Sequence, residues 1–171
     1  MLTRDGTIGN QENTCCVPGT GDPEGRLPDR VFAAAEKSTF FAGLDYLIIA
    51  VPLTRATTGL IGEAELRMLP PHAVLINPAR AAIIDQDALV RCLSEGWIRG
   101  AALDVHYAYP LPPEHPLWSL PNTVLTPHIA GAGLNPHFLP RTFDVFTENL
   151  GRFRSGQPLL NQLTPSEIAG E

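Results

Sequence analysis

Three continuous apolar runs start 27 residues apart in this 171-residue sequence, near residues 46, 73 and 100, and a fourth follows them. The runs are 45–51 (DYLIIAV), 73–77 (AVLIN), 100–105 (GAALDV) and 123–126 (TVLT). A run that is apolar at every position is typical of a parallel strand buried on both faces. One strand, one crossover helix and two short loops fill such a period. The sequence therefore predicts an α/β fold with a parallel sheet and right-handed crossovers.

Stretches with helical periodicity precede, separate and follow these runs. The predicted helices are 31–41, 62–69, 86–95 and 138–155. Asp85 is a favourable N-cap for the third helix, and Gly96 is a favourable stop signal. The fourth helix repeats large apolar residues at helical spacing, and we interpret this stripe as core or interface.

The composition excludes several classes of protein. Twelve Lys and Arg against eighteen Asp and Glu give a formal net charge of −6, whereas a nucleic-acid binder shows a basic face. No apolar run approaches the roughly 20 residues of a membrane span, and the N-terminus lacks the apolar core of a signal peptide. The cysteines (Cys15, Cys16 and Cys92) show neither metal-ligand spacing nor a disulfide framework. We therefore expect a cytoplasmic protein with no metal, no nucleic-acid partner and no membrane contact.

The chain divides by composition into three segments. Residues 1–30 have no hydrophobic period and predict an irregular or disordered tail, residues 31–163 carry the predicted fold, and residues 164–171 form a C-terminal tail. Gly19-Thr20-Gly21 resembles the start of a dinucleotide loop. However, Glu24 stands where the third glycine belongs, and no strand precedes the loop. We therefore expect no phosphate site in the tail.

Polar side chains follow the predicted strands at the points where ligands bind in open parallel sheets. Arg80 follows the second strand, Asp104 ends the third, and His128 follows the fourth. Because the carboxyl ends of parallel strands meet at one edge, a guanidinium and an imidazole converge there, with small residues around them. This pattern indicates a site for an anionic substrate next to a cofactor.

Five motifs in order and register resemble the D-isomer-specific 2-hydroxyacid dehydrogenases. They are VPLTRATTGLIGEAEL, LINPARAAIIDQDAL, GAALDV, PLPPEHPLW and VLTPHIAGA, within a match from Val31 to Leu163. The resemblance implies a partial Rossmann-like sheet, the C-terminal part of an NAD-binding domain, lacking the first βαβ unit and most of the substrate domain. It also implies hydride transfer between NAD or NADP and C2 of a small 2-hydroxy or 2-oxo acid.

The same resemblance implies roles for individual residues. Arg80 matches the arginine that holds the substrate carboxylate and polarises the keto oxygen, as a planar guanidinium can. His128 matches the acid/base histidine. The cofactor-binding positions implied are Val51, Pro52, Thr57, Pro78, Ala79, Arg80, Asp104, His128 and Gly131. Asp104 would lie near the nicotinamide end.

The sequence also departs from the family. The glycine-rich phosphate loop and the acidic residue that reads the ribose precede the matched region in the family, and neither is present here, so we expect a truncated protein. The family's catalytic glutamate is Tyr109 in this chain. A carboxylate favours the imidazolium form of histidine, whereas a phenol supplies only a hydrogen bond. We therefore expect His128 to titrate lower here than in its relatives.

Simpler interpretations stand beside these roles. Arg80 alone could be a surface arginine and His128 a loop histidine, and Asp104 could brace a loop. We interpret Tyr107 as packing at a sheet edge, Trp97 and Trp118 as packing anchors, and His72, His115 and His137 as solvent-facing. The alternative function is a non-catalytic remnant that acts as a dimerisation or interaction module, and a corepressor-like binding module is a weaker one. In either of the two main cases half a doubly wound sheet exposes an apolar edge, so we expect a homo-oligomer, with a dimer as its simplest form.

Overall fold

The computed structural model describes residues 1–8, 22, 24–131 and 136–165. The described chain forms two compact units, one built from residues 38–131 and the other from residues before 38 together with 136–165. The Gly19-Thr20-Gly21 segment lies outside the described residues.

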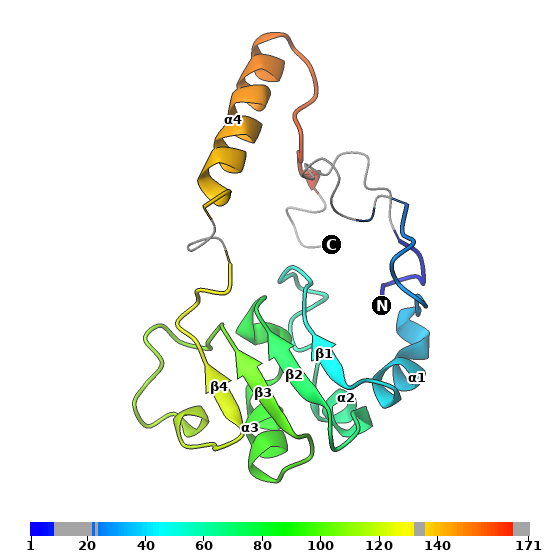
Figure 1. Cartoon of the computed structure of the whole chain (residues 1–171), viewed down its shortest axis with the longest axis vertical. Helices are drawn as coiled ribbons and strands as arrows, with labels where there is room; N and C mark the ends of the chain where they lie inside the picture. The colour runs from blue at the N-terminus through cyan, green and yellow to red at the C-terminus, as the bar shows by residue number, and fades with distance from the viewer. Residues whose placement is uncertain (9–21, 23, 132–135, 166–171) are drawn as a thin grey trace. The chain divides into compact units, whose positions relative to one another are not determined.

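The unit of residues 38–131 contains a four-stranded sheet that confirms the predicted fold class (Figure 1). Its strands are β1 (Tyr46–Ile48), β2 (Val74–Asn77), β3 (Gly100–Leu103) and β4 (Thr123–Leu125). All neighbouring pairs are parallel, and the order β1-β2-β3-β4 follows the chain. The strands are shorter than the apolar runs: β1, β3 and β4 end before their runs do, whereas β2 begins one residue after its run and ends with it at Asn77.

Two helices precede the sheet, η1 (Ala34–Glu36) and α1 (Lys37–Ala42). The others fill the connections between strands: α2 (Glu63–Met68) before β2, η2 (Ala81–Ile83) and α3 (Gln86–Ser94) before β3, and η3 (Pro116–Trp118) before β4. Asp85 caps α3 as predicted, because its carboxylate accepts a hydrogen bond of 2.8 Å from the Ala88 N–H. Gly96 follows α3 with φ +69°, a conformation that glycine adopts without strain.

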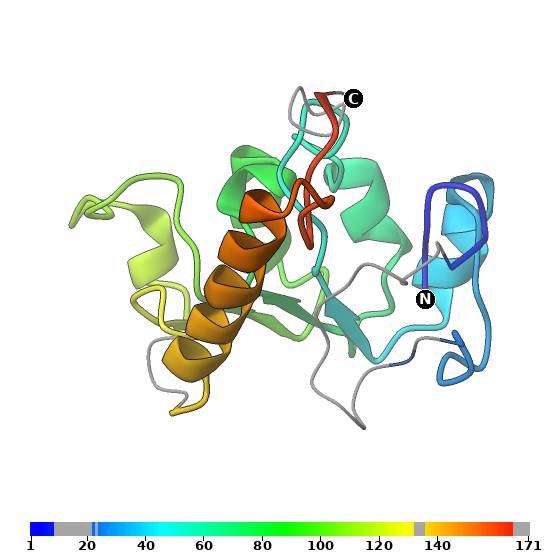
Figure 2. The same ribbon diagram turned by 90° about the horizontal axis from the view of Figure 1, so that it is seen from above.

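The two faces of the sheet differ in their cover. Figures 1 and 2 show α2 and α3 on one face. The in-register row of Leu47, Leu75 and Ala101 is buried. On the opposite face, Ile48 and Val124 are 60% and 62% exposed within one in-register row. Since parallel sheets are normally covered on both faces, this unit carries an apolar face that nothing within the unit covers.

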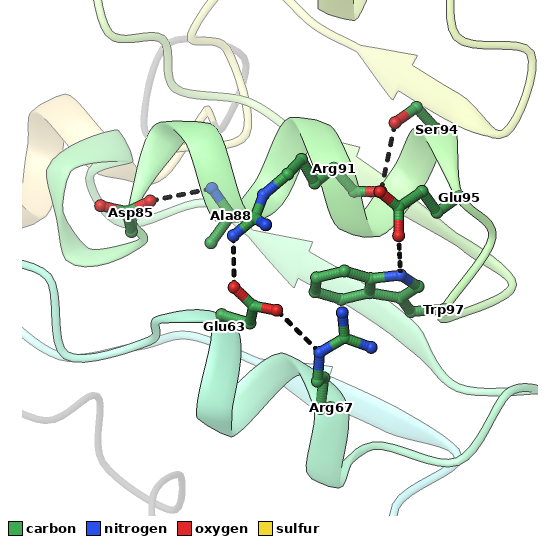
Figure 3. Close-up of polar contacts among 8 residues, drawn as sticks. All are labelled: Glu63, Arg67, Asp85, Ala88, Arg91, Ser94, Glu95 and Trp97. Carbon is green, nitrogen blue, oxygen red and sulfur yellow. Dashed lines mark hydrogen bonds and ion pairs between the residues drawn. The ribbon is translucent and has the colours of Figure 1, made fainter.

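Charged side chains join the two covering helices at their surface (Figure 3). Glu63 of α2 pairs with Arg67 at 2.8 Å and with Arg91 of α3. The Arg67 guanidinium lies 3.6 Å above the Trp97 ring, whose indole N–H donates to Glu95. Hydrogen bonds from the two arginines lower the pKa of Glu63. Such exposed pairs orient the helices and add little stability.

The second unit contains the longest helix, α4 (Phe138–Arg154), as predicted. No residue of α4 is buried, so its apolar stripe forms no core of this unit, and interface remains the prediction for it. Near the N-terminus, Leu2 bridges Phe32 and Asp5 bridges Ala33, so residues 1–8 pair with the chain that precedes α1. No described helix is both long enough and apolar enough to cross a membrane.

Candidate functional site

A small hollow connects the carboxyl ends of three strands. It has a volume of about 110 Å³. Its lining residues are Ile76, Asn77 and Pro78 after β2, Ala102, Leu103 and Asp104 at β3, and Val124, Thr126 and Ala130 around β4. Pro78 in this lining is two residues before Arg80, and Thr126 and Ala130 lie on either side of His128 in the sequence. The two loops that carry the predicted chemistry border one hollow.

The loop that carries Arg80 is held by a buried amide. Asn77 is 1% exposed, its amide N–H donates to the Arg80 carbonyl at 3.0 Å, and its amide oxygen accepts from the Ala79 N–H at 3.0 Å. Both hydrogen bonds span the turn that leaves β2. A buried amide with its groups satisfied fixes the turn in one conformation. Asn77 therefore determines where the Arg80 backbone leaves the sheet.

The Arg80 side chain is exposed, and its Nη1 donates only to the neighbouring Ala79 carbonyl, at 2.6 Å. It pairs with no carboxylate in the part of the chain that the structure describes. Most of its five donors therefore remain available to an anion, and a guanidinium binds a carboxylate through two parallel hydrogen bonds.

A buried carboxylate holds the loop that carries His128. Asp104, at the end of β3, is 5% exposed. One of its oxygens accepts from the Thr126 hydroxyl and from the Ile129 N–H at 2.8 Å, and the other accepts from the Ala130 N–H at 2.9 Å. Within this loop His128 has φ +59°, which non-glycine residues rarely adopt. The three bonds to Asp104 support that conformation.

The hydrogen bonds that the Asp104 carboxylate accepts also keep it ionised over the neutral range. Desolvation by itself would raise its pKa, but the hydrogen bonds from Thr126, Ile129 and Ala130 outweigh it, and the pKa is lowered from the ordinary 3.8. Because its oxygens are already used by the protein, this structure shows Asp104 as a brace for the histidine loop. A direct contact with a cofactor stays a prediction.

His128 has a side-chain partner on the neighbouring loop. The hydroxyl oxygen of Tyr109 lies 3.2 Å from Nδ1 of His128, and the two ring centroids are 5.7 Å apart. The same hydroxyl accepts the His106 N–H at 3.0 Å. The His106 side chain contacts the histidine loop as well, because its Nε2 lies 2.9 Å from the Thr126 carbonyl oxygen. The residue at the position of the family's glutamate therefore does reach the histidine.

The remaining predicted cofactor positions lie on the same edge of the sheet. Val51 and Pro52 leave β1 and are exposed. The Thr57 hydroxyl donates to the Pro52 carbonyl at 2.7 Å and accepts the Thr54 N–H at 2.8 Å, so in this structure it shapes the turn. Gly131 ends the described part of the histidine loop and is exposed. Their contact with a cofactor stays a prediction.

Several side chains differ from their predicted surroundings. His115 is only partly exposed: its Nδ1 accepts the Leu117 N–H at 3.3 Å, and its ring stacks on Tyr107. Tyr107 packs as predicted: its ring stacks on His115 and its hydroxyl donates to the Ile84 carbonyl at 3.1 Å, and this burial raises its pKa. Trp118 is 54% exposed and therefore a weak packing anchor.

Sequence reasoning missed the role of Asn77, although a buried asparagine between a strand and Pro78 is a recognisable turn signal.

Comparisons with known proteins identify the family of this chain. The family model described as "D-isomer specific 2-hydroxyacid dehydrogenase, NAD binding domain" matches residues 17–130. A glyoxylate reductase of Thermofilum pendens is 48% identical over 111 residues, which are 65% of this chain and 32% of that protein. A glyoxylate/hydroxypyruvate reductase B of Pectobacterium carotovorum is 48% identical over 94 residues, 55% of this chain and 29% of that protein. The chain thus spans about a third of the length of these curated relatives.

Solved structures of the same kind are similar in fold. A D-isomer specific 2-hydroxyacid dehydrogenase from Xanthobacter autotrophicus, in complex with NADPH and MES, superposes with a TM-score of 0.73 at 35% identity, covering 81% of this chain and 56% of that one. An NADPH-dependent glyoxylate/hydroxypyruvate reductase from Sinorhizobium meliloti, in complex with NADP and sulfate, gives 0.72 at 30% identity, covering 83% and 45%. The match of the family model over most of the chain, the parallel sheet and the loops after β2 and β4 lead to one conclusion: the chain belongs to the D-isomer specific 2-hydroxyacid dehydrogenase family, in its NAD-binding domain.

Proposed function

We propose that this chain takes part in NAD(P)-dependent reduction of a small 2-oxo acid to the 2-hydroxy acid, with glyoxylate and hydroxypyruvate as the first substrates to test. The observation that carries the proposal is the pair of braced loops at one hollow. Asn77 fixes the turn before Arg80, and Asp104 fixes the loop around His128. The names of the relatives supply the substrate class.

The residues around the hollow fit the nicotinamide end of the cofactor. Ala102 and Ala130 are small, and Pro78 lines the same hollow without a charge. When bound, a reduced nicotinamide supplies a hydride to the substrate carbon. The described residues that precede a helix contain no glycine-rich turn for the pyrophosphate. NADPH is the first candidate because the similar Xanthobacter dehydrogenase is in complex with NADPH and the similar Sinorhizobium reductase is NADPH-dependent.

Two side chains then act on the substrate: Arg80 binds it and His128 donates a proton to it. The Arg80 guanidinium binds the carboxylate and holds the neighbouring oxo group against the hollow. Protonated His128 gives its Nε2 proton to the oxo oxygen as negative charge develops there. A histidine suits this step because its unperturbed pKa of about 6.5 allows both protonation states near neutrality.

The proposal extends to the organisation of the chain. Residues 31–163 would be the cofactor domain, with 1–30 and 164–171 as flanking tails. We also propose a homo-oligomer located in the cytoplasm. A second function, a non-catalytic interaction module, is favoured by one observation: the apolar sheet face that carries Ile48 and Val124 has no cover within its own unit.

NADPH titration by calorimetry, followed by glyoxylate-dependent NADPH oxidation, tests the proposal. Arg80→Gln and His128→Gln should each lower turnover by about 100-fold or more, since both groups act on the reacting oxo acid. Arg55→Gln is the matched control, because Arg55 is also an exposed arginine on a loop after a strand. Full activity in both site variants would contradict the proposed roles. Absence of binding at millimolar NADPH would favour the interaction module.

A further inference from the structure

The hydroxyl group of Tyr109 lies between one pure donor and one group that can donate or accept. The His106 backbone N–H can only donate, and it reaches the hydroxyl oxygen at 3.0 Å. On the other side, Nδ1 of His128 lies 3.2 Å away and carries either a proton or a lone pair. A phenol has one hydrogen to give, and its oxygen is a weak acceptor because its lone pair is delocalised into the ring.

The hydrogen-bond partners therefore decide the direction of the bond to histidine. The His106 N–H already occupies the acceptor side of the hydroxyl, so the phenolic hydrogen is directed to Nδ1 of His128. We infer that Tyr109 is a positioning residue that holds neutral His128 with its proton on Nε2 and its lone pair on Nδ1. In the described part of the chain no residue is hydrogen-bonded to Nε2, so that N–H is available to a ligand.

A carboxylate at the same position would produce the opposite arrangement. It can only accept, so it would keep the proton on Nδ1 and leave a lone pair on Nε2. With Tyr109, neutral His128 offers a donor to a ligand oxygen, which suits the oxo group of a 2-oxo acid better than the hydroxyl proton of a 2-hydroxy acid. This preference for the oxo acid rests on the proposed function, whereas the tautomer does not.

Nitrogen-15 NMR of the full chain, at a pH where His128 is neutral, tests the tautomer directly. In the wild type we expect a protonated Nε2 and an unprotonated Nδ1. Tyr109→Glu should move the proton to Nδ1, and Tyr109→Phe should bring the two ring-nitrogen shifts closer together. His72 is the internal control, since it is exposed and pairs with Asp45 at 3.0 Å, away from this network.

Free histidine already favours the Nε2–H form, so the reversal in Tyr109→Glu is the decisive result. A proton on Nδ1 of the wild-type ring would overturn the inference, and so would identical ring-nitrogen shifts in the wild type and both variants.

Ligand binding separates this inference from the proposed function. Oxamate, a 2-oxo acid mimic, should bind the wild-type chain with NADPH present about 10-fold more tightly than glycolate, which equals about 1.4 kcal/mol. The preference should shrink in Tyr109→Glu at the same pH. If neither acid binds, the ligand preference fails together with the proposed function, and the nitrogen shifts still decide the tautomer.

Discussion

At the scale of single residues, two buried polar groups position the candidate site. Asn77 and Asp104 are the buried polar side chains of the described core, and each is hydrogen-bonded to a loop that carries a predicted catalytic residue. Burial of a polar group is costly unless its hydrogen bonds are satisfied, and here the bonds fix loop conformations.

Removing the Asp104 carboxylate should loosen the histidine loop. Asp104→Ala leaves the Ile129 and Ala130 N–H groups and the Thr126 hydroxyl without their acceptor. We expect a loss of about 3 kcal/mol in the free energy of unfolding. Urea titration followed by tryptophan fluorescence measures it, because Trp97 and Trp118 both lie in the sheet unit. An unchanged midpoint would show that the brace adds no stability.

The lowered pKa of Asp104 also predicts the sign of a pH effect. A carboxyl group whose folded pKa is below its unfolded value stabilises the fold above the unfolded pKa, and this stabilisation is lost as the pH falls through the folded value. The wild type should therefore lose more stability than Asp104→Asn when the pH falls below 3.8. Glu63 and Asp5 also have lowered pKa values, so the difference between the two proteins is the quantity to measure. If the unfolding free energies of the wild type and Asp104→Asn fell equally with pH, the lowered pKa of Asp104 would be contradicted.

At the scale of elements, the close approach of β3 to the turn before β4 depends on a glycine. A Cβ on Gly100 would collide with the backbone carbonyl of Asn122. Gly100→Ala should therefore cost about 1–3 kcal/mol, as overpacking does. Gly43→Ala is the control, because nothing lies within 4 Å of the added carbon and φ is not positive there. Equal unfolding midpoints for the two variants would contradict this packing.

The helix that covers β2 and β3 shields a thiol. Cys92 in α3 is buried, and its desolvation raises the pKa of the thiol to about 11. At pH 8 the native protein should leave Cys92 unmodified by iodoacetamide, whereas the urea-unfolded protein should be alkylated there. Peptide mass spectrometry resolves this cysteine from the other two. Rapid native modification would show that α3 detaches from the sheet.

The elements themselves were largely predictable from periodicity, and the loop geometry was not. Apolar runs and the Asp85 and Gly96 signals predicted the parallel strands, the helices and both ends of α3, since these depend on local pattern. The role of Asp104 could not be read this way, because its partners lie more than 20 residues away in sequence. The resemblance placed Tyr109 and His128 in the site, but only the fold shows that their side chains are hydrogen-bonded.

At the scale of the whole molecule, the outer edge of β1 should drive self-association. The Val74 N–H donates to the Asp45 carbonyl and the Ile49 N–H donates to the Ile76 carbonyl, so odd-numbered residues pair with β2 and the Ile48 N–H points away from it. No described strand pairs with that outer edge of β1. An unpaired edge beside an uncovered apolar face favours pairing with a second copy.

A proline at the outward-facing position tests this edge. Ile48→Pro removes a donor that β2 does not use, and proline is tolerated at such edge positions. Ile48→Thr is the matched control that keeps the donor. Light scattering should show association about 10-fold weaker in Ile48→Pro than in Ile48→Thr, which equals about 1.4 kcal/mol. A monodisperse wild-type monomer would contradict the prediction.

The proposed chemistry requires that the loops after β2 and β4 form one ligand site. Backbone amide NMR during titration with NADPH, and then with oxamate, tests it most directly. The amides of Ala79, Arg80, Thr126 and 128–131 should shift together with the same saturation curve, and Arg80→Gln should abolish the oxamate shifts in both loops. Shifts confined to one loop, or different saturation curves for the two, would contradict a shared site.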